Sequence, residues 1–329
     1  MQFYDFKEIE ERVILIGVQT EQDEDVAASL DELEELAATA GAVTVGKVIQ
    51  NREAVHPGTY IGKGKIEEVA ALLAAYDANG VICDDELSPA QMNNLERELD
   101  CKVMDRTLLI LDIFAGRATT SEGKIQVELA QLRYRSARLV GLRESLSRLG
   151  GGIGTRGPGE KKLETDRRLI RTRISALKAE LAQVEKHREL IRGKRTRGNL
   201  KTAAIVGYTN AGKSTLLNTL TGAGILAEDK LFATLDPTTR VLELKDGQQI
   251  LLTDTVGFIR KLPHHLVEAF KSTLEEAKYA DYIIHVVDAS NPQAELQMHT
   301  VYETLRELGA TGKKIITLLN KQDQVQGES

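Results

Sequence analysis

Apolar residues recur with two different spacings in the first third of the chain, and each spacing predicts one kind of element. Short β-branched or aliphatic runs predict strands, at residues 13–18, 43–45, 59–61, 81–83 and 102–104. Apolar residues three or four positions apart predict helices between these runs, at residues 25–40, 65–76 and 107–114. Ser88-Pro89-Ala90-Gln91 has the composition of a capping box and predicts one more helix start. Alternating strands and helices predict an α/β subdomain with a parallel sheet over residues 1–115.

The pattern changes between residues 116 and 197, where two long stretches are rich in arginine. We expect both stretches, residues 125–149 and 163–191, to be helices. The second has one apolar stripe, made of Leu163, Ile170, Ile174, Leu177, Leu181 and Val184. A long antiparallel helical hairpin would bury the apolar stripes of the two helices. The glycine-rich segment 150–159 is predicted to be the loop at its tip.

The segment from residue 198 to residue 329 begins with a predicted buried strand, residues 202–206, a glycine-rich loop and a helix start. This order is the context of a phosphate-binding P-loop. Its residues are Gly207, Tyr208, Thr209, Asn210, Ala211, Gly212, Lys213, Ser214 and Thr215. Glycines let backbone N–H groups turn toward a phosphate, Lys213 reaches the β- and γ-phosphates, and the Ser214 hydroxyl binds Mg²⁺. For a lone motif, a plain glycine turn with a solvated lysine would be the alternative.

Two later segments favour a GTP site over that alternative. A predicted strand at 250–253 ends in a D-x-x-G segment, made of Asp254, Thr255, Val256 and Gly257. Its Asp can orient a metal-bound water, and the N–H of its Gly can contact a γ-phosphate. A second strand, at 315–319, ends in Asn320, Lys321, Gln322 and Asp323. The Asp323 carboxylate can accept hydrogen bonds from guanine N1–H and N2–H₂, which adenine does not offer. Motifs that follow strands in this order predict a Ras-like P-loop GTPase domain over residues 198–329.

Between these motifs lies a segment in the position of switch I, which begins with Phe232, Ala233, Thr234, Leu235 and Asp236. Switch I supplies a threonine that completes the Mg²⁺ shell when a γ-phosphate is bound. Composition alone leaves Thr234, Thr238 and Thr239 as candidates for this ligand.

The charge distribution along the chain indicates a polyanionic partner for its middle region. The chain has a formal net charge of −6. Residues 116–201 contain 22 Lys and Arg against 9 Asp and Glu, whereas residues 1–115 contain 9 against 24. The basic side chains around the glycine-rich loop are Arg148, Arg156, Lys161, Lys162, Arg167 and Arg168. We favour RNA phosphate as their partner, and a solvated helical surface or a disordered linker loop is the alternative.

Other features exclude several classes of protein. Cys83 and Cys101 are the only cysteines, and we expect both to be free thiols in a reducing compartment. The N-terminus lacks a signal-peptide pattern, and no apolar run is long enough to span a bilayer, so we expect a cytoplasmic protein. Gly62-Lys63-Gly64-Lys65 could hold a phosphate, but a tight turn with exposed lysines is favoured because the Walker spacing is missing.

The chain as a whole resembles the HflX family of ribosome-associated GTPases, within the Obg–HflX-like superfamily of translational P-loop GTPases. The segments that support the resemblance are 59–65, 150–160, 163–168, 207–215, 232–240, 254–258 and 320–323. Relative to the family, the sequence lacks the Ser-Ala loop that supports the guanine, and also the final strand and helix. We therefore expect a C-terminally truncated GTPase domain.

The resemblance implies that Thr234 is the switch I ligand, so that Ser214 and Thr234 hold Mg²⁺. Lys213, Thr234 and Gly257 would then be the catalytic residues for hydrolysis of GTP to GDP and phosphate. The resemblance also implies binding to the large ribosomal subunit and its rRNA, with splitting or rescue of stalled or idle ribosomes. A second purine nucleotide at the N-terminal domain is part of the same expectation, and we expect a monomer. Asn210 occupies the P-loop position where some related GTPases bind K⁺.

These features favour a GTPase whose hydrolysis is stimulated by the ribosome. Phe258 follows Gly257 directly, where many Ras-like GTPases have a Gln that orients the attacking water, so slow turnover is expected of the isolated protein. The alternative is a GTP-gated RNA-binding or ribosome-assembly module in which hydrolysis only times release. A metabolic GTP enzyme is disfavoured because no further acid–base pair accompanies the motifs.

Replacement of Arg156, Lys161 and Lys162 by Ala should weaken ribosome binding and reduce its salt dependence, without affecting intrinsic GTP binding. Each lost phosphate contact lowers the slope of log affinity against log salt by about 0.7–0.9. Binding measured over a series of salt concentrations checks this, and an unchanged slope would show that the glycine-rich loop does not contact RNA phosphate.

Overall fold

The computed structural model describes residues 10–21, 25–149, 158–197, 200–222, 230–262, 266 and 271–325. They fall into two compact units, residues 1–113 with 134–168, and residues 114–133 with 169–329. The long helices α5 (Ser121–Leu149) and α6 (Pro158–Arg197) contribute residues to both units. Within the described ranges, no helix is long and apolar enough to cross a membrane. The division into domains at residues 115 and 197 stays a prediction.

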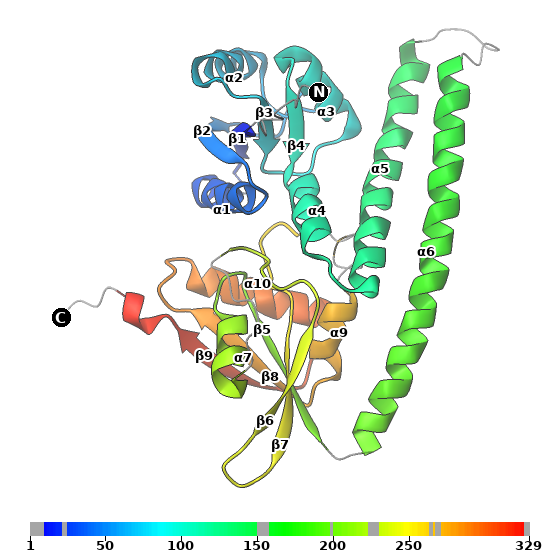
Figure 1. Ribbon diagram of the computed structural model, residues 1–329. Helices are drawn as coiled ribbons and strands as arrows, with labels where there is room; N and C mark the ends of the chain where they lie inside the picture. The colour runs from blue at the N-terminus through cyan, green and yellow to red at the C-terminus, as the bar shows by residue number, and fades with distance from the viewer. Residues whose placement is uncertain are drawn as a thin grey trace, which may run out of the picture. The chain divides into compact units, whose positions relative to one another are not determined.

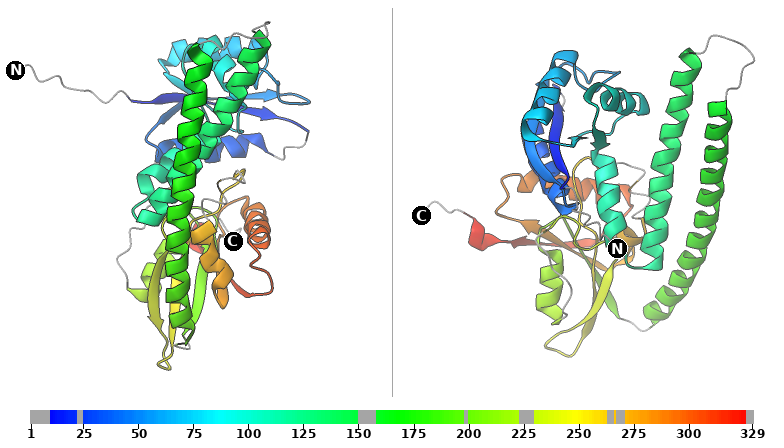
Figure 2. Two further views of the ribbon diagram at one scale, coloured as in Figure 1. Left: turned by 90° about the vertical axis from the view of Figure 1, so that its right-hand side faces the viewer. Right: turned by 45° about the horizontal axis from the view of Figure 1, so that its top comes forward.

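The first unit contains a four-stranded parallel sheet. Its order is β2 (Val43–Asn51), β1 (Arg12–Gln19), β3 (Gly80–Cys83) and β4 (Lys102–Asp105). Helix α1 (Val26–Thr39) covers one face, and the other face is covered by α2 (Lys63–Tyr76) and α3 (Pro89–Leu99) (Figures 1 and 2). The predicted parallel α/β unit is therefore confirmed.

Local sequence explains where these helices begin, and also one wrong prediction. The Asp25 side chain accepts the Ala28 N–H at the start of α1, and the predicted capping box of Ser88 and Gln91 is confirmed at the start of α3. The strand predicted at residues 59–61 is absent, because Tyr60 adopts a φ of 66° in a tight turn. Backbone hydrogen bonds between His56 and Tyr60 close the turn, and the Tyr60 hydroxyl donates to Asp85 at 2.6 Å.

A buried ionic cluster ties α1, the end of β3 and the start of α4 (Arg106–Arg117) together. The Arg106 guanidinium, 1% exposed, lies 2.7 Å from the Asp84 carboxylate and 2.6 Å from that of Glu32. Asp84 is fully buried and also accepts a hydrogen bond from Ser29. All three charged groups belong to this unit, and a buried charge of this kind is tolerated only when it is paired and hydrogen-bonded.

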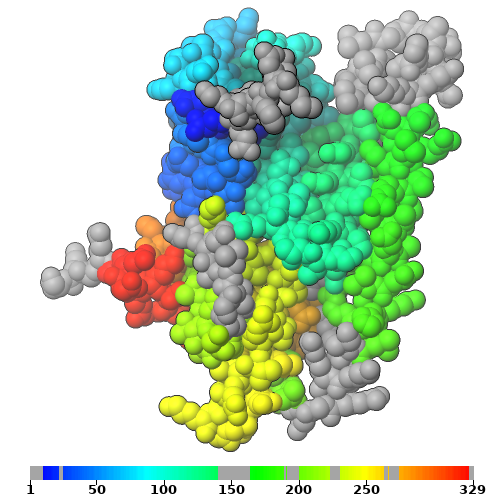
Figure 3. All heavy atoms as spheres, viewed as in Figure 1, coloured from blue at the N-terminus to red at the C-terminus, as the bar shows by residue number. Residues whose placement is uncertain are grey.

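The second unit is built on a five-stranded sheet, parallel except for its first strand. Its order is β6 (Thr238–Glu243), β7 (Gln249–Asp254), β5 (Lys201–Gly207), β8 (Tyr282–Asp288) and β9 (Lys314–Asn320). Besides its parts of α5 and α6, the described residues of this unit form α7 (Lys213–Thr221), α9 (Lys271–Tyr279), α10 (Ala294–Glu307) and the short η1 (Gln322–Gln324). Helix α7 lies on one face and α9 and α10 lie on the other (Figure 1). The tip of the β6–β7 hairpin is exposed at the surface (Figure 3).

The helices α5 and α6 are antiparallel, as predicted for the middle region. Arg173 pairs with Glu128 at 2.7 Å, and Arg188, further along α6, pairs with Glu122, which comes earlier in α5. Arg167 and Arg168 lie on α6. The glycine-rich loop with Arg156, and the side chains of Arg148, Lys161 and Lys162, lie outside the described part of the chain.

His285, in the central part of β8, is a buried histidine of the second unit. It is 1% exposed, and its ring meets that of Tyr302 on α10 edge-on, with the centroids 5.2 Å apart. Burial, together with the nearby Lys213 charge, lowers the pKa of His285 to about 4. His285 is therefore neutral in the folded protein at pH values where it would be protonated in the unfolded chain.

This pKa predicts a loss of stability in acid. Below about pH 6.5 the unfolded chain binds a proton at His285 that the folded chain does not bind until near pH 4. Between about pH 7 and about pH 5 this linkage costs about 2 kcal/mol of unfolding free energy. His285→Phe should remove that contribution, while the exposed His299→Asn should keep it. The unfolding free energy of each variant is measured by urea denaturation at both pH values, and hydrogen exchange of the β5 and β8 amides gives a second measurement. Equal acid sensitivity of wild type and His285→Phe would contradict the assignment.

Candidate active site

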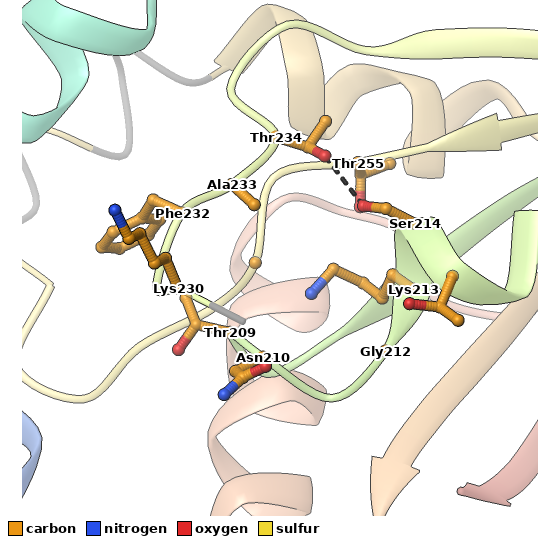
Figure 4. A pocket seen from close by; sticks show the side chains of 12 residues that line it. Thr209, Asn210, Gly212, Lys213, Ser214, Lys230, Phe232, Ala233, Thr234 and Thr255 are labelled. Atoms are coloured by element: carbon orange, nitrogen blue, oxygen red, sulfur yellow. Dashed lines mark hydrogen bonds between the residues drawn. The ribbon is translucent and has the colours of Figure 1, made fainter. Parts of the chain in front are cut away.

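The P-loop follows β5 at the centre of the second sheet, where the strand order changes direction. Open α/β sheets bind ligands at such a point, beyond the carboxyl ends of the strands. Gly212 has a φ of 94°, which favours glycine, and it caps the N-terminus of α7. Lys213 is 6% exposed and donates to the Tyr208 carbonyl oxygen at 2.6 Å, with its ammonium extending into the cleft (Figure 4). The helix N-terminus and the ammonium together form a site for an anion.

The D-x-x-G segment is docked on the P-loop through the backbone. The Phe258 N–H donates to the Gly207 oxygen at 3.1 Å, and the Thr209 N–H donates to the Phe258 oxygen at 2.8 Å. A Cβ on Gly257 would lie 2.8 Å from the Thr209 Cα, so only glycine allows this approach. The segment predicted to sense a γ-phosphate therefore lies directly against the segment predicted to bind it.

Three oxygen-bearing side chains from three elements meet beside the P-loop. The Ser214 hydroxyl donates to Asp254 Oδ2 at 2.6 Å and lies 2.8 Å from the Thr234 hydroxyl (Figure 4). Of the three candidate threonines, the structure brings only Thr234 to this position. Thr238 and Thr239 belong to β6, where the Thr239 hydroxyl lies 2.9 Å from that of Thr253.

This oxygen cluster fits a hard divalent cation. Hydroxyl and carboxylate oxygens are the ligands that Mg²⁺ prefers. Asp254 Oδ1 is buried and has no hydrogen-bond partner, so it retains a free acceptor for a metal-bound water. Burial raises the pKa of the Asp254 carboxyl above its usual value, and the Lys213 charge only partly offsets this. A cation beside Asp254 would stabilise the ionised form.

The segment predicted to recognise the base lies at the end of β9. The Asn320 amide donates to the Ala211 oxygen at 2.9 Å, which ties this segment to the P-loop as expected. The Lys321 ammonium lies 2.8 Å from the Asp288 carboxylate at the end of β8. Asp323 stands in η1 with its side chain exposed.

The described cleft is bounded by the P-loop, switch I and the D-x-x-G segment. Its lining is Thr209, Asn210, Gly212, Lys213, Ser214, Thr215, Lys230, Phe232, Ala233, Thr234, Thr255 and Gly257. The other predicted nucleotide contacts are not in this lining: Gly207, Tyr208, Ala211, Leu235, Asp236, Asp254, Val256, Asn320, Lys321, Gln322 and Asp323. Leu235 is buried, and Asp236 turns its carboxylate to Thr119 and Thr120. Lys230 lines the cleft but is not among the nucleotide contacts predicted from the sequence. Its position as a basic residue just before switch I could have indicated a phosphate contact.

Three family models match successive parts of the chain. Residues 27–115 match the model described as GTP-binding GTPase N-terminal, and residues 117–195 match the GTP-binding GTPase Middle Region. Residues 202–321 match the model described as 50S ribosome-binding GTPase.

Individual relatives match over nearly the whole chain. The GTPase HflX of Lacrimispora saccharolytica is 74% identical over 319 residues, which is 97% of this chain and 75% of that protein. The GTPase HflX of Escherichia coli is 47% identical over 316 residues, 96% of this chain and 74% of that protein.

Solved structures give the same result for the fold. A crystal structure of SsGBP in complex with GDP aligns with a TM-score of 0.54 at 30% identity, covering 96% of this chain and 84% of that chain. A GTP-binding protein from Sulfolobus solfataricus, also in complex with GDP, aligns with a TM-score of 0.51 at 28% identity over the same shares.

Asp323→Asn should weaken GTP binding by about 10–100-fold, because an amide cannot accept both N–H groups of the guanine edge and leaves one unpaired. The same variant should gain affinity for xanthosine triphosphate, in which a carbonyl replaces the C2 amine and can accept from the new amide. Titration of wild type and Asp323→Asn with GTP and with xanthosine triphosphate measures these affinities. The exposed Gln324→Asn, one position further on, is the control and should alter neither affinity; unchanged GTP binding in Asp323→Asn would contradict the site assignment.

Proposed function

This chain belongs to the HflX family of GTPases, and from that membership we propose that it binds the large ribosomal subunit and splits or rescues stalled or idle ribosomes. The chain is a GTPase. The match of residues 202–321 to the 50S ribosome-binding model is the observation that most directly supports this partner. The basic composition of residues 116–201 adds a charge complementary to rRNA.

In this proposal the P-loop binds the nucleotide phosphates. The Lys213 ammonium is held by the Tyr208 oxygen inside the cleft, so it approaches the β- and γ-phosphates with little loss of side-chain entropy. The N-terminus of α7 presents further N–H donors to the same anion. Because Lys213 is almost fully buried, its attraction to phosphate is screened less than that of a surface lysine.

Ser214 and Thr234 would hold Mg²⁺, and Asp254 would orient a water bound to it. When bound there, Mg²⁺ neutralises charge that develops on the phosphate oxygens. The structure supports this role because the two hydroxyls and the carboxylate lie within hydrogen-bond distance of one another. Asn210, which lines the cleft, is our proposed ligand for K⁺ beside the phosphates.

The described lining of the cleft has no side chain suited to activating water. It includes no Asp, Glu, His or Gln. Phe258, at the position where many Ras-like GTPases have Gln, is 2% exposed, and its backbone is paired with the P-loop. We infer that turnover is slow until the ribosome orders the attacking water or adds charge. Gly257 would contribute its N–H to the γ-phosphate.

A second purine nucleotide at the N-terminal domain, a monomeric state and a cytoplasmic location stay predictions.

The proposal predicts that large subunits accelerate hydrolysis. GTPase rates are measured at saturating GTP for the protein alone, with large subunits and with small subunits as a control. Large subunits should raise kcat, with about 10³–10⁵ as an upper guide, the range for a trans-acting arginine. A free protein that hydrolyses GTP as fast as the complex would refute partner dependence, and equal stimulation by small subunits would refute the choice of partner.

Two further arms of the same experiment resolve the remaining alternatives. Light scattering reports whether the GTP-bound protein dissociates intact ribosomes; stimulation without dissociation would favour the GTP-gated binding module. Rates in K⁺ and Na⁺ buffers test the role of Asn210, and equal rates would remove K⁺ from the proposal.

A further inference from the structure

Asp236 of switch I binds the turn that precedes helix α5, not the cleft. Its Oδ2 accepts hydrogen bonds from the Thr119 N–H at 2.9 Å, the Thr119 hydroxyl at 2.7 Å and the Thr120 N–H at 3.0 Å. Its Oδ1 accepts from the Thr120 hydroxyl at 2.6 Å. Hydrogen bonds to an ionised carboxylate are stronger than those between neutral groups. The carboxylate therefore fixes this part of switch I to residues more than 100 positions earlier in the chain.

The first turn of α5 leaves room for this carboxylate at one position, Gly123. A Cβ on Gly123 would lie 2.4 Å from Asp236 Oδ1, a distance that real contacts do not reach. The Gly123 N–H donates to the Thr120 hydroxyl at 2.9 Å, so the same hydroxyl caps the helix and binds Asp236. A glycine inside a helix reduces its stability, and the contact with Asp236 gives this glycine a structural reason.

A second contact anchors the other end of the same segment. Phe232 is 3% exposed, and its ring meets that of Phe114 edge-on at 4.6 Å between centroids. Phe114 lies on α4, which ends at Arg117 just before the turn that binds Asp236. Thr234 stands midway between the two anchors and directs its hydroxyl to Ser214 (Figure 4). Phe232 and Asp236 thus contact α4 and the turn after it, while Thr234 between them faces the metal site.

We propose that Asp236 is a positioning residue that, through Thr119, Thr120 and Gly123, couples the Thr234 metal ligand of the GTP site to the turn between α4 and α5. We name this set of four residues the switch I latch. The proposal rests on the GTP site but not on the ribosome as partner. It gives the junction between the N-terminal and middle regions a means of sensing the nucleotide.

The coupling works in both directions. A GTP complex that draws Thr234 onto the metal favours the closed latch, and a closed latch must raise affinity for GTP by the same factor. GDP, which lacks the γ-phosphate, does not require Thr234 and should be nearly insensitive to the latch. Any partner that displaces the α4–α5 turn would therefore weaken GTP binding selectively.

The first test removes the carboxylate. Asp236→Asn should bind a non-hydrolysable GTP analogue with Mg²⁺ about tenfold more weakly, within the usual range of coupling between two sites. GDP affinity should stay within about twofold, and the loss should vanish in EDTA, because Asp236 acts through the metal ligand. Glu243→Gln, which removes one exposed carboxylate of β6, is the matched control and should change neither affinity.

The second test opens the latch without removing any polar group. Gly123→Ala should improve the intrinsic helix propensity of α5 and yet displace Asp236. It should therefore lower the affinity for the GTP analogue while the protein stays folded. Gly116→Ala is the control, because nothing lies within 4 Å of the Cβ that it adds to α4. A double variant, Gly123→Ala with Asp236→Asn, should lose no more affinity than either single variant.

Hydrogen exchange gives a readout that a purely structural role would not change. The Thr119 and Thr120 amides should exchange more slowly with the GTP analogue than with GDP, and this difference should disappear in Asp236→Asn. An unchanged ratio of GTP-analogue to GDP affinity in both Asp236→Asn and Gly123→Ala would overturn the proposal, as would identical protection with both nucleotides. These experiments contain no ribosome, so their outcome tests the switch I latch independently of the proposed ribosome binding.

Discussion

The active site depends on the close pairing of two backbones, the P-loop and the D-x-x-G segment. Phe258 exchanges hydrogen bonds with Gly207 and Thr209, and this pairing requires that Gly257 have no side chain. It brings Asp254 beside Ser214 and Lys213, so that a buried carboxylate and a buried ammonium stabilise one another. The Asn320 amide joins the same loop from the end of β9. The D-x-x-G segment and the Asn320 segment are thus positioned by contact with backbone atoms of the P-loop, whereas switch I meets it through the Thr234 and Ser214 side chains.

The same pairing determines how Phe258 is placed next to the phosphate-binding loop. Phe258 contributes its backbone to the P-loop contact and its ring to the interior, which leaves no polar group at the position from which Gln orients water in many Ras-like GTPases. The described cleft has an ammonium and hydroxyls for binding but no side chain that can accept a proton from water. The described lining of the cleft therefore suits phosphate binding better than the activation of water, and this is the basis of the partner dependence proposed above.

Switch I connects this site to the rest of the molecule. Phe232 and Asp236 are anchored on Phe114 and on the turn before α5, and Thr234 between them faces Ser214. A loop with one partner could order at the metal without consequence elsewhere. A loop with two partners couples the two contact surfaces, because the free energy of closing on one surface is shared with the other. In the proposed coupling, the turn before α5 would therefore respond to the nucleotide state.

The sequence by itself determined the features that lie within one strand, loop or helix. The P-loop spacing, the capping box of Ser88 and Gln91 and the parallel α/β order all follow from short-range patterns, because backbone conformation and capping depend on residues a few positions apart. Composition left three threonines open and the family resemblance favoured Thr234, which the structure brings to Ser214. Tertiary structure alone decided that Tyr60 forms a turn instead of a strand, and that Asp236 binds Thr119 and Thr120 instead of lining the cleft. These outcomes depend on partners far apart in the chain, and no local pattern specifies which distant groups packing will bring within hydrogen-bond distance.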